Sequence, residues 1–267
     1  MTTTTRPGRT APARRPVART VTVLVPVAVF VAVWWFLTGV LAGDHLILSG
    51  FAPQRALPAL VEIAVHGTLG QDVAASLWRL LVGMGIAVLV GVPLGLTSGL
   101  LPLFEHATRP LFHFLRMISP LSWAPVAVAL FGIGHQPVFF LIAIAAVWPI
   151  TLNTIAGVHA IEPGFLGVAR SLGARPAELL TSVVLPAVRT HLLTGVRLAL
   201  GTAWIVLVPA EMLGVDSGLG YAILNARDRL AFDQLMAVIL VIGAIGYLLD
   251  ALARWSLRGR VAAQATG

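Results

Sequence analysis

The sequence predicts an all-α integral membrane protein with six transmembrane helices and cytoplasmic N and C termini. Of its 267 residues, 58% are hydrophobic and only 11% are charged. Soluble domains carry about 25% charged residues, so the bilayer is expected to be the solvent for most of this chain. Long apolar runs recur along the sequence, and arginines gather at their ends.

Six apolar runs each approach or exceed the ~20 residues that cross ~30 Å of hydrocarbon. They are predicted at about 21–42, 74–101, 110–133, 138–158, 188–213 and 234–255, within one transmembrane domain over 21–258. Pro93 predicts a bend in the second run, and Ser119-Pro120 predicts a break in the third. Outside the runs, we expect a disordered basic N-tail (1–20), a long polar loop (159–187) and a C-tail (259–267).

The arginine distribution predicts the orientation. With six spans, twelve arginines fall on the side of the termini and the loop 159–187, and three fall on the other side. The three are Arg55, Arg227 and Arg229. Because cytoplasmic segments are enriched in basic residues, the termini and this loop are expected in the cytoplasm.

Composition excludes several kinds of chemistry. All 18 basic residues are arginine, so the chain has no P-loop lysine for ATP and no Schiff-base lysine. It has no cysteine for a thiolate site, and its seven histidines lack metal-ligand spacing. The net charge of +7 is scattered along the chain and does not indicate nucleic-acid binding. We expect this chain itself to bind no metal and no cofactor.

The loop segment GVARSLGARPAELLTSVVLP, residues 167–186, has a distinctive spacing. Gly173 follows Ala169 after three residues, and nine more precede Val-Val-Leu-Pro at 183–186. This spacing resembles the signature of ATP-binding-cassette importer permeases, EAA-x3-G-x9-I-x-L-P. Gly167 and Val168 depart from it, because they replace the usual Glu and Ala.

Further segments in the same order resemble the nitrate/sulfonate/taurine subfamily of these permeases. They are SPLSWAP from 119, FGIG from 131, WPITLNT from 148, AEMLG from 210, and SGLGY from 217 followed by NARD from 225. Together they cover roughly residues 55–258.

The resemblance implies a type I importer permease (MetI-like) fold in the bacterial inner membrane. It implies a homodimer, two separate ATPase subunits that use ATP and Mg, and an extracytoplasmic solute-binding protein. The cargo is expected to be a small solute, an anion such as an aliphatic sulfonate, taurine or nitrate.

The resemblance also implies that the loop transmits force from the ATPases. A helix over 162–172 is expected to present Phe165, Leu166, Ala169 and Leu172 on one side. The full predicted coupling set is Glu162, Phe165, Leu166, Gly167, Ala169, Leu172, Gly173, Ala174, Glu178, Leu185 and Pro186. The plainer interpretation is a surface helix that only connects two spans.

Charged residues within the spans yield further hypotheses. Arg116 and Arg197 each lie about two turns into a span. They either form an electropositive vestibule, or they extend to the cytoplasmic interface or bond to carbonyls of a neighbouring broken helix. Arg79 and Glu211 are expected to pair, as a structural pair rather than a proton relay.

Thr151, Asn153 and Thr154 either satisfy the carbonyl freed by Pro149 or line the solute path. The candidate path residues are Ser119, Trp123, Asn153, Arg197 and Met212.

Two other function classes remain open at this point. An ion-coupled secondary carrier of a small anion would need an intramembrane carboxylate, and only Glu211 and Asp250 are available. An intramembrane enzyme would need a buried nucleophile and base in facing spans, and the sequence offers no convincing pair.

Overall fold

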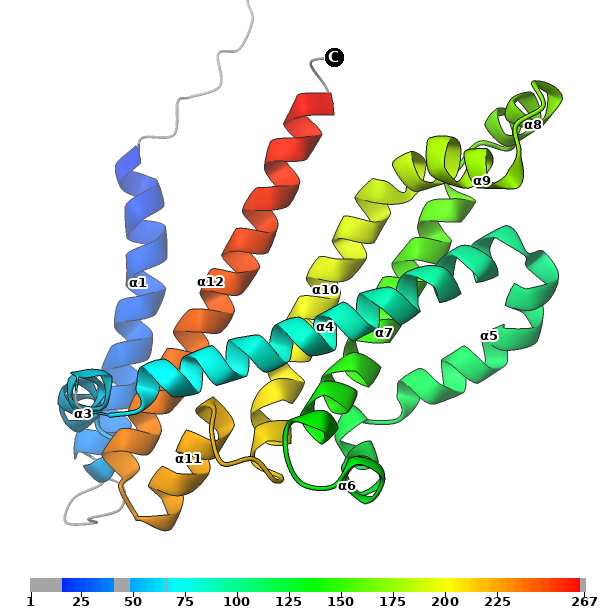
Figure 1. Ribbon diagram of the computed structural model, residues 1–267. Helices are drawn as coiled ribbons and strands as arrows, with labels where there is room; N and C mark the ends of the chain where they lie inside the picture. The colour runs from blue at the N-terminus through cyan, green and yellow to red at the C-terminus, as the bar shows by residue number, and fades with distance from the viewer. Residues whose placement is uncertain (1–15, 41–48, 66, 265–267) are drawn as a thin grey trace, which may run out of the picture.

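The computed structural model describes residues 16–40, 49–65 and 67–264, and every regular element in these ranges is a helix (Figure 1). In chain order they are α1 (Pro16–Trp35) with a π turn (Phe36–Val40), α3 (Pro53–Val65), α4 (Leu69–Leu100), α5 (Pro102–Met117), a 3-10 turn (Pro120–Trp123), α6 (Ala124–Phe131), α7 (His135–His159), α8 (Pro163–Ser171), α9 (Pro176–Leu179) with a π turn (Leu180–Val184), α10 (Leu185–Glu211), α11 (Leu219–Asp228) and α12 (Phe232–Gln264).

Four described helices are long and apolar enough to cross a membrane, and a bent pair makes a fifth candidate. The four are α4, α7, α12 and the continuous helix Pro176–Glu211. The first predicted run contains only a shorter apolar helix, Ala28–Gly39, and its residues 41–42 lie outside the described part. α1 begins at Pro16, within the segment predicted as a disordered tail, whose first fifteen residues are not described.

The core is formed by α4, α7 and α10, which pack along one another (Figure 1). Glycines at 83, 91, 95 and 99 are separated by eight, four and four residues, and this face of α4 meets α7. A Cβ at Gly83 would lie 2.5 Å from Ile142 Cγ2, and one at Gly95 would lie 2.5 Å from Thr154 Cβ. Small residues let helix backbones approach closely, which favours van der Waals packing in a membrane, where apolar burial drives little association.

Pro93 lies on the exposed face of α4, and α4 remains one uninterrupted helix from Leu69 to Leu100. Proline removes one backbone hydrogen bond from a helix. Here the opposite, glycine-bearing face stays packed against α7 along its length, which holds the helix together. Pro93 therefore does not divide α4 into two helices.

The third predicted run is not one straight crossing. α5 begins at Pro102, eight residues before the predicted start of the run, and takes in Glu105 and Arg109. The chain then bends by 90° between Met117 and Pro120, and α6 continues for eight residues. The predicted break at Ser119-Pro120 is confirmed. The sequence did not predict the direction of α6 relative to α5, because a proline indicates where a helix ends and not the direction of the following segment.

The helical bundle has two distinct ends (Figure 1). α8 and α9 project at one end, which we call the α8 end, and α3 and α11 lie at the other, which we call the α11 end. α11 lies between the predicted runs 188–213 and 234–255, where no helix was predicted. A backbone hydrogen bond of 3.1 Å from Gly134 N to Gly214 O joins the α6–α7 and α10–α11 turns at the α11 end.

Candidate functional site

The segment 159–187 forms a helical elbow at the α8 end. α8 starts at Pro163, and proline is favoured at the first helical position because its missing N–H has no helical partner there. It ends at Ser171, and Gly173 follows the C-cap Leu172 with a φ of +84°, which is unfavourable for residues with a side chain. Gly173 N donates to Arg170 O (3.0 Å) and Ala174 N donates to Ala169 O (3.1 Å), which is the pattern of a Schellman cap. Gly173 thus caps α8 and lets the chain turn back into α9.

α8 has one exposed apolar face and one face turned toward the bundle. Phe165, Val168 and Leu172 are exposed by 64%, 60% and 82%. Leu166 instead packs against the buried cluster of Val158, Val184 and Val188. The prediction that Leu166 shares one exposed side with Phe165 and Leu172 is therefore wrong.

Val168 was missed as a member of this face, since it was read only as a departure from the signature. Helical spacing from Phe165 could have found it, because residues three apart lie on the same side. Ala169 is half-buried at the edge of the face. We call Phe165, Val168 and Leu172 the α8 apolar face.

The remaining polar residues of the elbow have local roles in the structure. Glu178 Oε2 accepts a hydrogen bond of 2.9 Å from Arg175 N at the start of α9. Glu162 is the exposed residue before α8, and a Cβ at Gly167 would meet nothing within 4 Å. The position where the signature has Glu is thus open space on the exposed side of α8.

Leu185 and Pro186 lie at the start of α10, which continues from α9 through the π turn Leu180–Val184. The structure shows one helical segment from Pro176 to Glu211, so the chain passes from the elbow into α10 without a break. A π turn before Pro186 fits the missing proline N–H, which leaves an upstream carbonyl without its usual donor.

Gly173 and Gly167 provide a matched pair of variants. Both have open space around the site of a Cβ, but only Gly173 has a positive φ. We expect Gly173→Ala to destabilise the end of α8 by about 1 kcal/mol, because alanine is strained in this conformation. We expect Gly167→Ala to stabilise α8 by about 0.5–1 kcal/mol, because alanine has the higher helix propensity.

Amide hydrogen exchange across residues 163–174 measures both changes. Exchange should be faster in Gly173→Ala and slower in Gly167→Ala. Equal exchange in the two variants would show that the cap at Gly173 does not control this elbow.

The five predicted path residues lie on several elements of the structure. Ser119 precedes the 3-10 turn at the 90° bend, and Trp123 packs against the core. Met212 caps α10 at the α11 end. An apolar groove of about 560 Å³ between α4, α10 and α12 has Arg197 in its lining, but none of the other four.

Arg197 has a carboxylate partner in the structure. Its Nε lies 3.2 Å from Asp250 Oδ1 on α12, and Asp250 also pairs with Arg254 one turn later. The sequence hypotheses for Arg197 did not include this contact. Arg116 is exposed at the end of α5, away from this cluster in the chain.

The three polar residues after Pro149 bond to carbonyl groups, but not to the one that we expected. Pro149 frees the carbonyl of Ala145, four residues earlier. Thr151 Oγ1 donates to Gly91 O (3.2 Å), Asn153 Nδ2 to Pro149 O (2.8 Å) and Thr154 Oγ1 to Ile150 O (2.8 Å). The prediction that these side chains bond to the carbonyl freed by Pro149 is therefore wrong.

At the α11 end, Arg79 and Glu211 form the buried ion pair that the sequence predicted. Arg79 Nη1 and Glu211 Oε1 are 2.6 Å apart, and both side chains have 0% exposure. Arg79 also donates to Ser217 O, to Ser217 Oγ (both 2.7 Å) and to His135 Nδ1 (3.0 Å). Glu211 accepts from Ser76 Oγ and from Gly220 N.

These contacts fix the start of α11. Ser76 Oγ accepts from Leu219 N (2.9 Å), and Asp72 Oδ1 accepts from Gly218 N (2.8 Å). A Cβ at Gly218 would lie 2.5 Å from both Arg79 Nη1 and Glu211 Oε1. We call Asp72, Ser76, Arg79, Glu211 and Ser217 the buried polar network. The sequence indicated its central pair but not the other members, which come from distant segments.

Long apolar helices, a buried polar network and a projecting amphipathic elbow define a membrane-embedded transport subunit. The chain belongs to the family described as the binding-protein-dependent transport system inner membrane component, which matches residues 91–260. This confirms the family resemblance found in the sequence.

Its relatives include permease proteins with several named cargoes. The taurine transport system permease protein TauC of Escherichia coli K12 is 36% identical over 89% of this chain and 88% of its own length. The bicarbonate transport system permease protein CmpB of Synechococcus elongatus is 38% identical over 69% of this chain and 66% of its own length. The nitrate import permease protein NrtB of Leptolyngbya laminosa is 36% identical over 68% of this chain and 65% of its own length.

The fold is shared with a solved transporter structure. The inward-facing MetNI methionine ABC transporter matches with a TM-score of 0.63 at 18% identity, over 73% of this chain and 97% of that chain. The chain is therefore a permease subunit of an ATP-binding-cassette importer in the inner membrane, with a MetI-like fold. It is a transport component and not an enzyme.

Proposed function

We propose that this subunit imports a small anion delivered by an extracytoplasmic solute-binding protein. Two copies of the chain would form the path, and two ATPase subunits would bind at the α8 end. The relatives named for taurine, bicarbonate and nitrate support an anionic or sulfonate-bearing cargo, since all three names denote small oxyanions or a zwitterion that contains one.

The α8 apolar face is the observation that carries this proposal. α8 lies outside the candidate spans, yet Phe165, Val168 and Leu172 expose large apolar side chains. An exposed apolar cluster on a helix outside the membrane spans indicates a protein partner. A helix seated in a groove of an ATPase subunit is a common way to cover such a face.

We propose a six-span topology with the termini and α8 in the cytoplasm. α1 would supply the first span, and α5 with α6 would supply a broken third. The arginine distribution supports this orientation. Nucleotide-driven closure of the ATPases would then move the two α8 elbows and switch the spans between two states. ATP and Mg would be bound by the ATPases and not by this chain.

The geometry gives little support to an ion-coupled carrier. Glu211 pairs with Arg79, and Asp250 contacts both Arg197 and Arg254. A carboxylate that binds a coupling ion must be free to exchange its partner, whereas these two carboxylates already have guanidinium partners.

Reconstitution of the full transporter in proteoliposomes tests the proposal. With its ATPase and binding protein, we expect uptake of labelled taurine, nitrate or bicarbonate that requires ATP hydrolysis and the binding protein. Collapse of the proton gradient should leave uptake unchanged. Uptake by this chain alone, driven by a proton gradient without ATP, would instead show a secondary carrier.

A further inference from the structure

α5 has an exposed basic side along much of its length. His106, Arg109, His113 and Arg116 are separated by three, four and three positions, so they share one side of the helix. All four residues are exposed, and together they cover about 15 Å of helix length. We call these four residues the α5 basic stripe.

The other sides of α5 have a different character. One side is half-buried and consists of Glu105, Thr108, Phe112 and Leu115. Another side is exposed and apolar and consists of Leu103, Leu111, Phe114 and Met117. The helix therefore presents one side that packs on the bundle, one that suits lipid, and the basic stripe, which suits neither.

Two contacts with α7 indicate how deep the stripe lies. Glu105 Oε2 is 3.1 Å from His159 Nε2 at the end of α7. Phe112 packs against Trp148 near the middle of α7, with ring centroids 5.7 Å apart. α5 therefore runs back along α7 from the α8 end (Figure 1). His113 then lies level with the middle of α7, which is long and apolar enough to cross a membrane.

A basic side at this depth is unfavourable against lipid. A charged residue at the centre of a membrane helix costs about 2.5–3.5 kcal/mol on insertion scales. In the described part of the chain, no side chain of the stripe has a hydrogen bond or ion pair. Exposed arginines without a carboxylate partner also occur at Arg55, Arg170 and Arg189, so alignment along a candidate broken span is what distinguishes the stripe. The stripe therefore requires water or another chain beside it.

A dry contact between two copies of the chain would not stabilise the stripe. In a twofold dimer, the same surface of each copy meets its counterpart. Two basic stripes in direct contact would bring like charges together, which costs several kcal/mol. Water and anions between the two stripes would remove this repulsion.

We propose that the α5 basic stripe forms one wall of the water-filled solute path and attracts anions into it. This inference rests on the proposed function, in which two copies form the path and α5 with α6 makes the third span. Guanidinium and imidazole groups offer N–H donors to the oxygens of an anion. A row of exposed, weak sites lets an ion enter and leave, whereas a single tight site would hold it.

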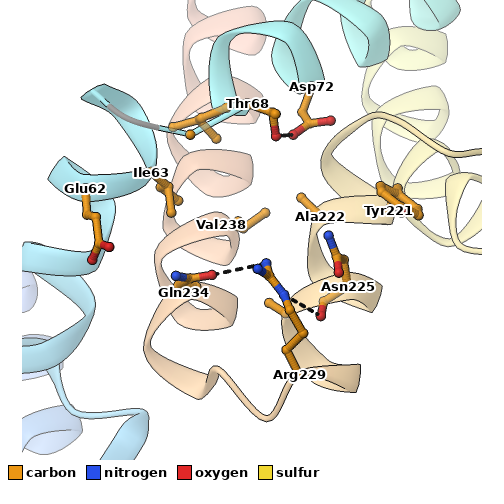
Figure 2. A pocket seen from close by; sticks show the side chains of 13 residues that line it. Glu62, Ile63, Thr68, Asp72, Tyr221, Ala222, Asn225, Arg229, Gln234 and Val238 are labelled. Atoms are coloured by element: carbon orange, nitrogen blue, oxygen red, sulfur yellow. Dashed lines mark hydrogen bonds between the residues drawn. The ribbon is translucent and has the colours of Figure 1, made fainter.

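A polar cavity at the α11 end contains an arginine in contrasting surroundings. This cavity, of about 340 Å³, lies between α3, α4, α11 and α12, and none of its lining residues belongs to α5 (Figure 2). Arg229 in its lining donates to Asn225 O at 3.4 Å and to Gln234 Oε1 at 3.3 Å. The same lining carries Glu62 and Asp72. Arg229 is therefore an exposed arginine near acidic residues, which makes it a matched control for the stripe.

Single-cysteine labelling of the complete transporter in lipid nanodiscs tests the proposal. The chain contains no cysteine, so each introduced thiol is the only one in this subunit. The stripe variants are Arg109→Cys, His113→Cys and Arg116→Cys, and the controls are Phe114→Cys on the apolar side and Arg229→Cys. The reagents are two water-soluble methanethiosulfonates, one with a sulfonate group and one with a trimethylammonium group.

We expect the stripe thiols to react with both reagents and to favour the anionic one. At position 113, the ratio of anionic to cationic labelling rates, relative to a free thiol, should rise about tenfold, because the remaining basic residues attract the anion. Adding Arg109→Gln and Arg116→Gln to His113→Cys should abolish this preference. Arg229→Cys should react without it, and Phe114→Cys should react slowly with both reagents, because a thiol in apolar surroundings stays protonated.

Three results would overturn the proposal. They are labelling at position 109 without labelling at 113 and 116, which would place α5 at the lipid headgroups, equal labelling of His113→Cys and Phe114→Cys, or the same charge preference at 113 and 229. If one stripe variant does not fold, the next stripe position gives the same comparison.

Labelling does not require transport, so the two proposals fail separately. A stripe that fails this test leaves ATP-driven import by the reconstituted transporter intact. Absence of ATP-driven import together with the expected labelling would instead contradict the proposed function and leave the water-accessible stripe standing.

Discussion

Replacement of Glu211 by alanine is expected to destabilise the protein by about 3–5 kcal/mol, because it leaves the buried Arg79 guanidinium without its carboxylate. Both side chains have 0% exposure, so neither water nor lipid headgroups can compensate. Gly220 N and Ser76 Oγ would also lose their acceptor. Thermal unfolding of the purified chain in detergent measures this effect. It is monitored as the loss of the monodisperse peak in size-exclusion chromatography.

The double variant Arg79→Met/Glu211→Leu separates charge from packing. Removing both charges is expected to cost less than removing Glu211 alone, because no unpaired ion remains buried. Asp228→Asn is the exposed control, since it breaks the surface pair with Arg227 and should cost less than about 1 kcal/mol. Equal losses in Glu211→Ala and Asp228→Asn would show that the buried polar network does not stabilise the fold.

Leu172→Asp is expected to weaken binding of the ATPase subunit by roughly thirtyfold or more, about 2 kcal/mol at a well-packed contact. Leu172 has 82% exposure at the end of α8, so the substitution should leave the fold of this chain intact. A carboxylate in an apolar groove of the partner would remain unpaired, which is costly. Affinity measured between nanodisc-embedded permease and purified ATPase tests this expectation.

Ile133→Asp is the matched control for the α8 apolar face. Ile133 is also 82% exposed, but it lies in the α6–α7 turn, which bonds to the α10–α11 turn at the α11 end. Its substitution should not change ATPase affinity. If Leu172→Asp and Phe165→Asp both bind the ATPase normally, then α8 only connects two helices, and the plainer interpretation of the loop is correct.

The sequence alone predicted the helical class and the approximate position of the long helices. The length of an apolar run and the positions of proline and glycine at its ends are local properties. They can therefore be read from the sequence without knowledge of the fold. The spacing around Gly173 and Pro186 also identified the family, and Arg79 and Glu211 were paired because both charges were placed near the same end of their spans. The cost of an isolated charge in the membrane made that pairing predictable.

Only the tertiary structure decided contacts between segments far apart in the chain. Asp250 lies 53 residues from Arg197, and Gly218 N lies 146 residues from its acceptor Asp72. No local pattern encodes which residues meet when α4, α10, α11 and α12 come together. The orientation of Leu166 and Val168 on α8 was decided in the same way, since the buried cluster at Val158 and Val184 selects which side faces inward. Helix formation depends on neighbours within four residues, whereas charge pairing and face selection depend on the packed arrangement of the whole bundle.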